Sequence, residues 1–288
     1  MSAFSSAWLG LREPLDAASR APQIAKALNR IRPDRTVQIT DLASGTGANL
    51  RYLSQVIGGH QDWCLIDHDR ALLDAIPARM REWAAERGAR VDQSGRELII
   101  SGRDFECRTR SVQRDLAVDL PEIELPAEAL VTASALLDLV SEAWLQTLAQ
   151  RCLSVRAPVL FALTYDGRVR FDPHEPEDER VQELVNHHQT SDKGFGRALG
   201  PAAAGKATRS FEAIGYRVEC ERSDWHINPS DQSLQEALLE DWLAAAIEIA
   251  PEETSTLQSW VQRRHAHVAG GRSELNVGHV DILGWIPE

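Results

Sequence analysis

Short apolar runs alternate along this chain with longer stretches that have helical periodicity. Runs of roughly four to eight apolar or β-branched residues between turn signals are typical of strands. The chain has such runs at residues 37–42, 63–67, 129–133 and 159–163, and residues 105–112 are expected to form the third strand. The run at 159–163 is apolar throughout, which suits a central parallel strand buried on both faces.

The stretches between these runs have the period of amphipathic helices. Leu72, Ile76, Met80 and Trp83 recur at steps of four and three residues, and Gly88 follows them as a helix end. Regular alternation of strand and helix favours a parallel sheet with right-handed crossovers. Further helices are expected through Ile57 and over residues 202–214, 234–249 and 253–268.

Three features complete the predicted sheet. Residues 90–113 look like a β-hairpin that runs into the third strand, with Ser94-Gly95 as its turn. Residues 216–221 and 275–286 predict two last strands, which could form an antiparallel edge. We therefore expect an α/β fold with a doubly wound, mostly parallel seven-stranded sheet, helices on both faces and an antiparallel strand at the edge.

The domain organisation follows from where this rhythm is interrupted. Residues 1–35 precede the first strand and predict an N-terminal helical cap, and residues 36–288 form the main domain. A segment at about 166–200 contains an acidic, proline-containing stretch, a short helix and a glycine-rich loop. Its glycine and lysine content predicts a mobile lid or substrate-binding insertion.

The formal net charge of -12 shifts the prediction away from nucleic acids, because proteins that hold phosphate backbones usually present a basic face. Only the pair Arg263-Arg264 and scattered arginines between residues 103 and 114 approach such a face. We expect a small-molecule substrate and no nucleic acid. A second copy of the chain against the apolar C-terminal helices is an alternative to their burial on the sheet, so a homodimer stays open.

The cysteines and the N-terminal residues bear on the compartment. The four cysteines lie more than forty residues apart and form no CxxC or CxxH pair, so we expect reduced thiols and no metal site. The first residues lack a basic start followed by an apolar core, and the chain has no apolar run of about eighteen residues. We expect a cytoplasmic protein without a membrane partner.

The strongest chemical signal is the sequence DLASGTGAN at residues 41–49, at a strand-to-helix turn. Glycine lets the backbone approach a ligand there, and the following helix offers free N–H groups. A dinucleotide site prefers G-x-G-x-x-G, but its third glycine is Leu50 here. Asp41 inside the strand is unsuited to a pyrophosphate, whereas a cationic ligand group would favour it.

An acid at the end of the second strand adds to this signal. Asp67 follows Gly47 by twenty residues and can accept hydrogen bonds from both hydroxyls of a ribose. Asp69 is better placed to cap the next helix. A ribose acid alone is shared by several cofactors, but Asp41 and Asp67 with this glycine spacing favour S-adenosylmethionine (SAM), which carries an α-ammonium and a sulfonium.

These segments resemble the motifs of class I, Rossmann-like SAM-dependent methyltransferases. DLASGTGAN is similar to the first motif, D/E-x-G-x-G-x-G, with Ala43 in place of its first glycine. LIDHD resembles the second motif, SVQRDLA the third and TASALLDLVSEAWL the fourth. WLGLREPLDAASRA near the N-terminus is similar to an uncharacterised bacterial branch of this class. The likeness covers residues 35–165 well and the remainder only in layout.

The resemblance implies SAM as cofactor and a set of residues that hold it. Asp67 would bind the ribose, His68 would lie beside the adenine and Asp115 near its amino group. Either Arg12 or Arg20 would hold the SAM carboxylate. The full set is Arg12, Asp41, Ala43, Gly45, Gly47, Asn49, Asp67, His68, Asp115, Ala133 and Ser134. For Asp115 the alternative is a helix cap, and for Arg12 a surface ion pair with Glu13 or Asp16.

Candidates for the chemistry itself are fewer. His187 and His188 precede the glycine-rich loop and could act as a general base, or could simply lie at a solvated helix end. Asp138 follows the fourth strand and could orient the acceptor, or cap a helix. His265, His267 and His279 are expected at the surface or in packing.

The function that these observations favour is transfer of the SAM methyl group to O or N of a small molecule. Alignment and exclusion of water would carry most of the catalysis, since the sulfonium already activates the methyl group. The alternatives are a non-catalytic partner protein with this fold and an NAD-dependent oxidoreductase. A nucleic-acid methyltransferase would often show an N/D-P-P-Y/F tetrad, which the fourth strand lacks.

Overall fold

The computed structural model of the chain describes residues 5–31, 36–95 and 97–287. Five parallel strands form the centre of its sheet, in the order β5-β2-β1-β6-β7. They are β1 (Val37–Leu42), β2 (Gly59–Asp67), β5 (Phe105–Gln113), β6 (Leu130–Ser134) and β7 (Val159–Asp172). The chain crosses from one side of β1 to the other between β5 and β6, which confirms the doubly wound α/β fold. Ligands of such sheets bind at this reversal of strand order, beyond the carboxyl ends of the strands.

Antiparallel strands extend this parallel centre on both sides. Beyond β7 lie β10 (Glu274–Trp285) and then β8 (Arg217–Arg222), which pair antiparallel as expected. Together with the five parallel strands they make the seven that were predicted. The antiparallel strand β10 lies one place in from the edge, with β8 outside it.

The described residues contain three further strands. The predicted hairpin, β3 (Arg90–Ser94) and β4 (Glu97–Ser101), pairs with β5 and adds two strands at the other edge. The short strand β9 (Trp225–Ile227) pairs with β10. It was not predicted, because three residues are too few for a periodic signal.

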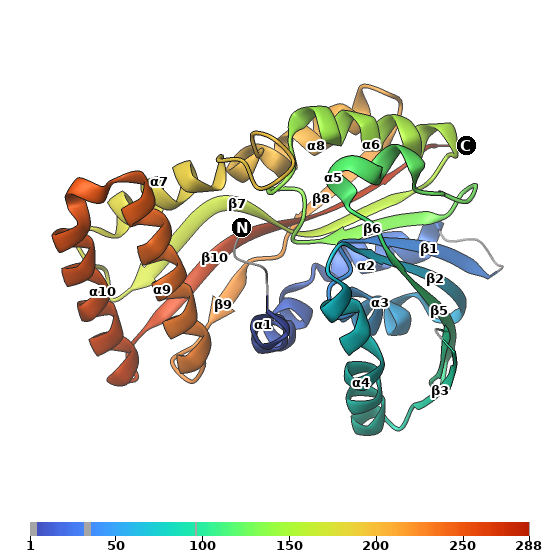
Figure 1. Cartoon of the computed structure of the whole chain (residues 1–288), viewed down its shortest axis with the longest axis horizontal. Helices are drawn as coiled ribbons and strands as arrows, with labels where there is room; N and C mark the ends of the chain where they lie inside the picture. The colour runs from blue at the N-terminus through green and yellow to red at the C-terminus, as the bar shows by residue number, and fades with distance from the viewer. Residues whose placement is uncertain (1–4, 32–35, 96, 288) are drawn as a thin grey trace.

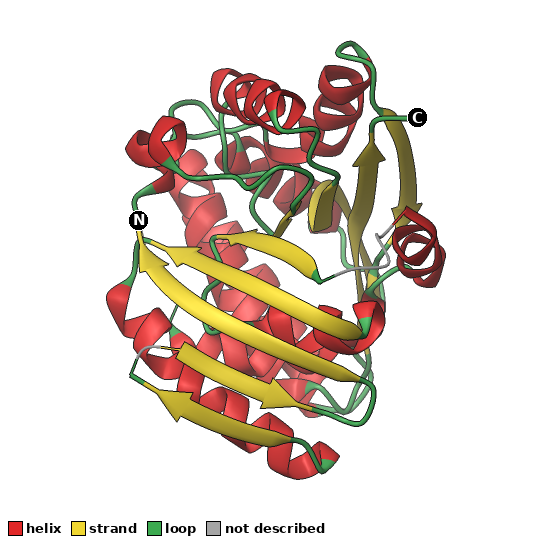
Figure 2. Cartoon of the chain, turned by 90° about the vertical axis from the view of Figure 1, so that its right-hand side faces the viewer, coloured by secondary structure: helices red, strands yellow, loops and turns green. Residues whose placement is uncertain are grey.

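Helices cover both faces of the sheet, as Figures 1 and 2 show. On one face α2 (Pro22–Ile31), α3 (Ala48–Ile57) and α4 (Arg70–Arg87) enclose one core. On the other α5 (Leu116–Asp119), α6 (Glu142–Ser154) and α8 (Ala203–Glu212) enclose a second core. Successive strand residues point to opposite faces, so Leu130 packs in the first core and Val131 in the second. Single turns of 3₁₀-helix lie at Leu120–Glu122, Gly200–Ala202 and Pro251–Glu253.

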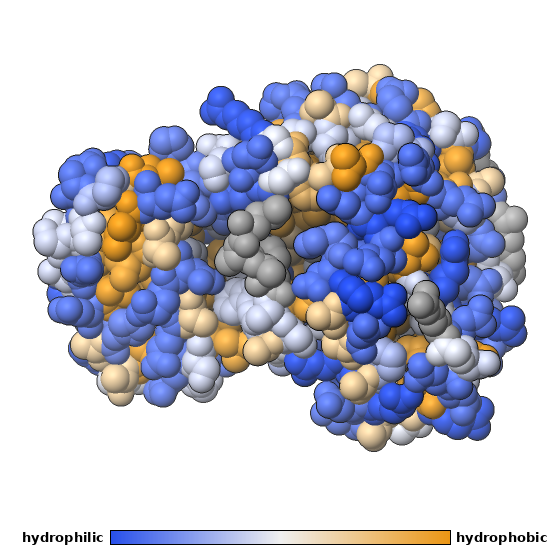
Figure 3. Space-filling model, in the orientation of Figure 1, coloured by the Kyte–Doolittle hydropathy of each residue, from blue (hydrophilic) through white to orange (hydrophobic). Residues whose placement is uncertain are grey.

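The strands β7 and β10 continue past the sheet and carry a second lobe, on the left in Figure 1. Residues 166–172 were expected to begin the insertion, but they extend β7 and pair with the start of β10. The helices α7 (Asp178–Gln189), α9 (Gln232–Ile249) and α10 (Thr254–Ala269) pack on these extended strands around a third core. The C-terminal helices thus bury against the sheet extension, and an apolar strip remains on their outer surface (Figure 3).

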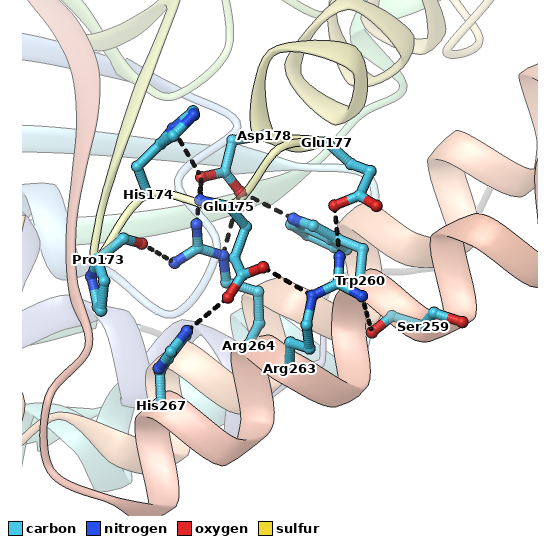
Figure 4. Close-up of polar contacts among 10 residues, drawn as sticks. All are labelled: Pro173, His174, Glu175, Glu177, Asp178, Ser259, Trp260, Arg263, Arg264 and His267. Atoms are coloured by element: carbon cyan, nitrogen blue, oxygen red, sulfur yellow. Dashed lines mark hydrogen bonds and ion pairs between the residues drawn. The ribbon is translucent and has the colours of Figure 1, made fainter.

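A polar network anchors the start of α7 to α10 in this lobe (Figure 4). Arg264 is fully buried; it donates hydrogen bonds to both carboxylate oxygens of Asp178 and to the carbonyl of Pro173. Trp260 donates a third bond to Asp178 at 2.8 Å. A buried arginine needs such a complete set of acceptors, because an unpaired buried charge is costly. The network therefore fixes α7, whose last turn carries His187 and His188.

The helix α1 (Ser6–Ser19) lies between the two lobes in Figure 1. None of its residues is fully buried, and polar contacts hold it in place. Glu13 accepts two hydrogen bonds from Arg51 of α3, and the Ser6 carbonyl accepts one from Arg79 of α4. The predicted N-terminal cap is thus helical where it is described, but its boundary at residue 35 lies outside the described residues. No helix in the described ranges is long and apolar enough to cross a membrane.

Candidate functional site

The glycine turn that follows β1 has a left-handed backbone at three positions. The φ angles are +53° at Ala43, +53° at Gly45 and +83° at Gly47. The Ser44 amide donates to the Ile66 carbonyl at 2.9 Å, which holds the turn against β2. The helix α3 begins immediately afterwards, so its free N–H groups face the carboxyl edge of the sheet. Non-glycine residues rarely adopt such angles, so Ala43 is a strained substitute for the expected glycine.

Asp67 lies beside this turn at the end of β2, as the sequence predicts. Its side chain accepts hydrogen bonds from the Gly45 amide at 2.8 Å and the Asp69 amide at 2.9 Å. Asp69, not Asp67, caps α4 through the Ala71 amide. His68 is exposed, with its Nδ1 3.4 Å from an Asp67 oxygen. Asp67 is therefore a preorganised acceptor at the edge of the glycine turn.

Asp41 stands within β1 at the centre of a buried polar network. Asn49 donates through Nδ2 to Asp41 at 2.9 Å and to the Thr132 hydroxyl at 3.0 Å. Arg20 donates to the Asn49 side-chain oxygen at 3.0 Å. The other carboxylate oxygen of Asp41, Oδ2, is buried and has no partner in the described structure. Burial raises the pKa of Asp41 to about 7, against the lowering effect of Asn49.

The two candidate arginines occupy different places. Arg20 is buried beside Asn49, 3.4 Å from Asp281, and lies over the Tyr52 ring. Arg12 pairs with Asp16 at 2.8 Å and lies over Trp225 of β9. The partner is one of the two expected for a surface ion pair, but both side chains are largely buried. Arg20 thus belongs to the glycine-turn network, and Arg12 to the neighbouring lobe.

Asp281 is a buried residue of this network that sequence reasoning missed. It lies on β10, where one oxygen accepts from the Leu163 amide at 2.8 Å and the other from the Ala21 amide at 3.0 Å. It thereby ties the segment after α1 to β7. An acid within the apolar run HVDILGW was the signal that could have found it.

Left-handed backbone recurs along the carboxyl edge of the parallel strands. Besides Ala43 after β1, φ is +52° at Ala135 after β6 and +51° at Leu163 in β7, just past its pairing with β6. Strained non-glycine residues persist only where their surroundings fix them, and they cluster at functional sites. Three neighbouring strands therefore place strained residues around one edge of the sheet.

The remaining predicted cofactor residues lie along the same edge. Ala133 is buried and Ser134 half-buried at the end of β6. Asp115 follows β5 and caps α5, with its side chain accepting from the Ala117 amide at 2.9 Å. The cap was one of the two interpretations of Asp115, and it leaves the adenine role as a prediction.

Asp138, in the turn after β6, is a buried carboxyl that, like Asp41, has an oxygen without a partner among the described residues. This oxygen is Oδ1, and the residue is 6% exposed. Burial raises its pKa to about 6, while bonds from backbone groups, including that of Tyr165, and the charges of Arg12 and Lys193 oppose the shift. This carboxyl therefore changes its protonation near neutral pH, which suits proton transfer.

The two candidate histidines at the end of α7 differ in their surroundings. His187 is exposed. His188 is half-buried, with its Nδ1 3.3 Å from the Lys193 ammonium and its Nε2 3.3 Å from Glu248. Burial and Lys193 lower its pKa, so His188 is uncharged at neutral pH. The charge of Lys193 also acts to lower the pKa of Asp138, so it affects both His188 and Asp138.

No group of three or more side chains suited to a metal ion occurs in the described parts of the chain. The cysteines are free; three are buried and Cys220 is exposed. The site thus consists of a glycine turn, buried carboxyls, amides and arginines.

No family model and no curated protein matches this chain. Solved structures resemble it at low identity. A phosphoethanolamine N-methyltransferase of Haemonchus contortus, in complex with S-adenosylhomocysteine, is 13% identical with a TM-score of 0.47; the match covers 100% of this chain and 58% of that one. A SAM-dependent methyltransferase of Thiobacillus denitrificans is 13% identical with a TM-score of 0.45, covering 97% and 98%. One from Geobacter sulfurreducens is 15% identical with a TM-score of 0.43, covering 96% and 98%. Likeness at this level leaves the function to be argued from the site.

Proposed function

We propose that this chain is a SAM-dependent methyltransferase that transfers a methyl group to O or N of a small-molecule acceptor. The observation that carries the proposal is the unpartnered, buried Oδ2 of Asp41 beside a left-handed glycine turn and the Asp67 carboxylate. A buried carboxyl oxygen without a partner is costly, and a cationic ligand group removes that cost. The α-ammonium of SAM is such a group, so the residues present fit this cofactor.

The same residues disfavour a dinucleotide. Leu50 stands where the third glycine of a dinucleotide site would be, and its side chain is fully buried in the core under α3. The carboxyl of Asp41 would lie close to the negatively charged pyrophosphate and repel it. Both points weigh against the alternative of an NAD-dependent oxidoreductase.

Each element of the site then has a part in binding. Asp67 accepts hydrogen bonds from the ribose hydroxyls, and the Gly45–Gly47 turn lets the backbone approach the ligand. Asn49 and Arg20 hold Asp41 in place, and Arg20 lies where it can pair with the ligand carboxylate. Leu9 of α1 packs over Gly45 and covers the turn. A covered site excludes water and strengthens its electrostatic interactions.

The methyl acceptor would bind between the sheet edge and the second lobe. When bound, SAM supplies an electrophilic methyl group on a sulfonium. The chain's own residues align the acceptor, and Asp138 takes the proton that an acceptor N–H or O–H loses on methylation. His188 and His187 border this region from the end of α7. The net charge of -12 favours a small molecule over a nucleic acid as acceptor.

A crystal structure with S-adenosylhomocysteine tests this assignment. We expect the ribose hydroxyls on Asp67 and the ligand amino group within hydrogen-bond distance of Asp41 Oδ2. Ligand density elsewhere, or an amino group that points away from Asp41, would contradict it. Soaks with NAD at equal concentration provide the control for a general nucleotide preference.

A further inference from the structure

Asp281 of β10 is a buried carboxylate that three segments of the chain share. It is 1% exposed. Its Oδ1 accepts a hydrogen bond from the Leu163 amide of β7 at 2.8 Å, and its Oδ2 accepts one from the Ala21 amide at 3.0 Å. The same Oδ2 lies 3.4 Å from Nε of Arg20. Both oxygens are therefore occupied by groups from segments that are distant in sequence.

The first oxygen of Asp281 serves the sheet. The register of β10 against β7 shifts at Asp281, so two residues of β7, Ala162 and Leu163, lie opposite it. A bulge of this kind takes a backbone N–H out of the ladder. The Leu163 amide is such a group, at a residue whose φ is +51°, and Asp281 accepts its hydrogen bond. The other oxygen is left for the segment that joins α1 to α2.

The second oxygen of Asp281 holds Arg20. The Arg20 side chain is 5% exposed, and Asp281 is its only carboxylate within ion-pair distance among the described residues. A buried guanidinium needs such a counter-charge. Arg20 also donates to the side-chain oxygen of Asn49 at 3.0 Å, and its guanidinium carbon lies 4.5 Å from the centre of the Tyr52 ring. These three contacts fix the orientation of the guanidinium.

Arg20 is connected to the Asp41 carboxyl through Asn49. Nδ2 of Asn49 donates to Oδ1 of Asp41 at 2.9 Å, while Oδ2 of Asp41 is buried without a partner in the described structure. Nε of Arg20 is also buried and makes no hydrogen bond to the described residues. This network thus offers one cationic and one anionic group with unused bonding capacity. An α-amino acid group, which carries a carboxylate and an ammonium on one carbon, needs such a pair.

We infer that Asp281 is a positioning residue for the amino-acid end of the adenosyl ligand: it holds Arg20 so that the guanidinium pairs with the ligand carboxylate while Asp41 binds the ammonium. The inference rests on the proposed function. None of the contacts of Asp281 involves Asp67, which binds the ribose in that proposal. Loss of Asp281 should therefore weaken binding at the amino-acid end of the ligand and leave binding at the adenosine end unchanged.

Two ligands that differ only at this end provide the test. S-adenosylhomocysteine ends in an α-amino acid group, whereas 5′-methylthioadenosine has the same adenosine and sulfur but ends in a methyl group. Asp281→Asn removes the charge beside Arg20. In calorimetry we expect this variant to bind S-adenosylhomocysteine about tenfold more weakly and 5′-methylthioadenosine as tightly as the wild type. A role in the fold alone would weaken both ligands equally.

A double-mutant cycle tests whether Asp281 acts through Arg20. Arg20→Gln should cause the same selective loss for S-adenosylhomocysteine. In the Arg20→Gln background, Asp281→Asn should add no further loss, because the group that it positions is already absent. Glu274→Gln, at the exposed start of the same strand, is the matched control and should change the affinity for neither ligand. Additive losses in the double variant would show that Asp281 acts independently of Arg20.

A measurement on the wild type does not require the variants to fold. The ¹H–¹⁵N signal of Arg20 Nε, assigned through the backbone signals of Arg20, should shift when S-adenosylhomocysteine is added. If Asp281→Asn is unfolded in thermal melting, this signal decides, and its constancy in the ligand complex would overturn the inference.

The outcomes separate this inference from the proposed function. Equal losses for both ligands in Asp281→Asn, or an unchanged affinity for S-adenosylhomocysteine, would contradict the role of Asp281 and leave the cofactor assignment intact. If S-adenosylhomocysteine does not bind the wild type at all, the proposed function fails first.

Discussion

The carboxylate of Asp67 accepts a hydrogen bond from the Gly45 amide at 2.8 Å. This contact joins the end of β2 to the glycine turn after β1, two segments that are separate in sequence. Asp67, which is proposed to bind the ribose, therefore also shapes the turn that would hold the rest of the cofactor. The two strongest sequence signals are thus parts of one structure.

Replacing Asp67 tests its role in cofactor binding. Asp67→Ala removes a charged acceptor, and hydrogen bonds to charged groups contribute about 1.5–3 kcal/mol each. We expect the affinity for S-adenosylhomocysteine, measured by calorimetry, to fall at least about tenfold. Asp67→Asn retains one acceptor oxygen for the Gly45 amide and should lose less.

The control for this experiment is Asp69→Ala. Asp69 caps α4, so its loss should lower the unfolding free energy by about 1 kcal/mol and leave the affinity unchanged. If Asp67→Ala and Asp69→Ala behaved alike, Asp67 would have no ligand role.

Replacing Ala43 by glycine is expected to stabilise the fold. Its φ of +53° is unfavourable for alanine but not for glycine. Ala43→Gly should raise the unfolding free energy in urea by roughly 0.5–1 kcal/mol. Gly47→Ala places a side chain at φ +83° and should act in the opposite direction. A loss of stability in Ala43→Gly would show that the turn carries no strain at this position.

Replacing Asp41 by asparagine is expected to have opposite effects on the stability of the fold and on ligand binding. Its pKa is raised from 3.8 to about 7 by burial, so the folded state holds a proton that the unfolded chain releases. The protonated Asp41 carboxyl therefore makes its full contribution to the unfolding free energy below about pH 4, and this contribution is lost as the pH rises toward 7. Asp41→Asn imitates the protonated form and should remove this loss. At about 1.36 kcal/mol per pKa unit, the gain at pH 8 is at most about 4 kcal/mol.

The same substitution should weaken the binding of SAM, because an amide oxygen can accept a hydrogen bond from an ammonium group but cannot form an ion pair with it. Urea unfolding at acidic and alkaline pH, with calorimetry at neutral pH, measures both effects. Asp62→Asn, at an exposed position of β2, is the matched control and should change neither. Tighter binding in Asp41→Asn would exclude a cationic ligand group at this carboxyl.

The network of Figure 4 predicts a large effect far from the glycine turn. Asp178→Asn leaves the buried guanidinium of Arg264 without its counter-charge, and breaking a buried pair costs about 3–5 kcal/mol. Urea unfolding should show this loss. Glu253→Gln breaks the exposed pair with Arg180 and should cost much less. Equal losses would mean that the buried pair does not anchor α7.

The glycine-turn half of the site could be predicted from the sequence because its signals are local. The order Asp41, Gly45, Gly47 lies within one strand and turn, and Asp67 ends the next strand. The Asp41–Asn49–Arg20 network was only partly predicted, since it needs α1 and α3 to be placed together. Sequence spacing indicates which residues share a turn, but not which side chains complete one another.

The second lobe depends on pairing between distant segments. Residues 166–172 contain glycine and charged residues typical of a loop, yet their backbone pairs with residues 274–277 and continues β7. Only that pairing, with β9 added, brings Trp225 and His279 to Tyr165. No local pattern contains this information, and for that reason the sequence left His279 open between a surface position and packing.

Calorimetric titration with S-adenosylhomocysteine, with NAD and NADP as controls, measures whether the protein binds the proposed cofactor. We expect saturable binding of S-adenosylhomocysteine and SAM, loss of affinity in Asp67→Ala and no binding of the dinucleotides. Binding of NAD or NADP in preference to the adenosyl ligands, or no binding of S-adenosylhomocysteine to the folded protein, would contradict it.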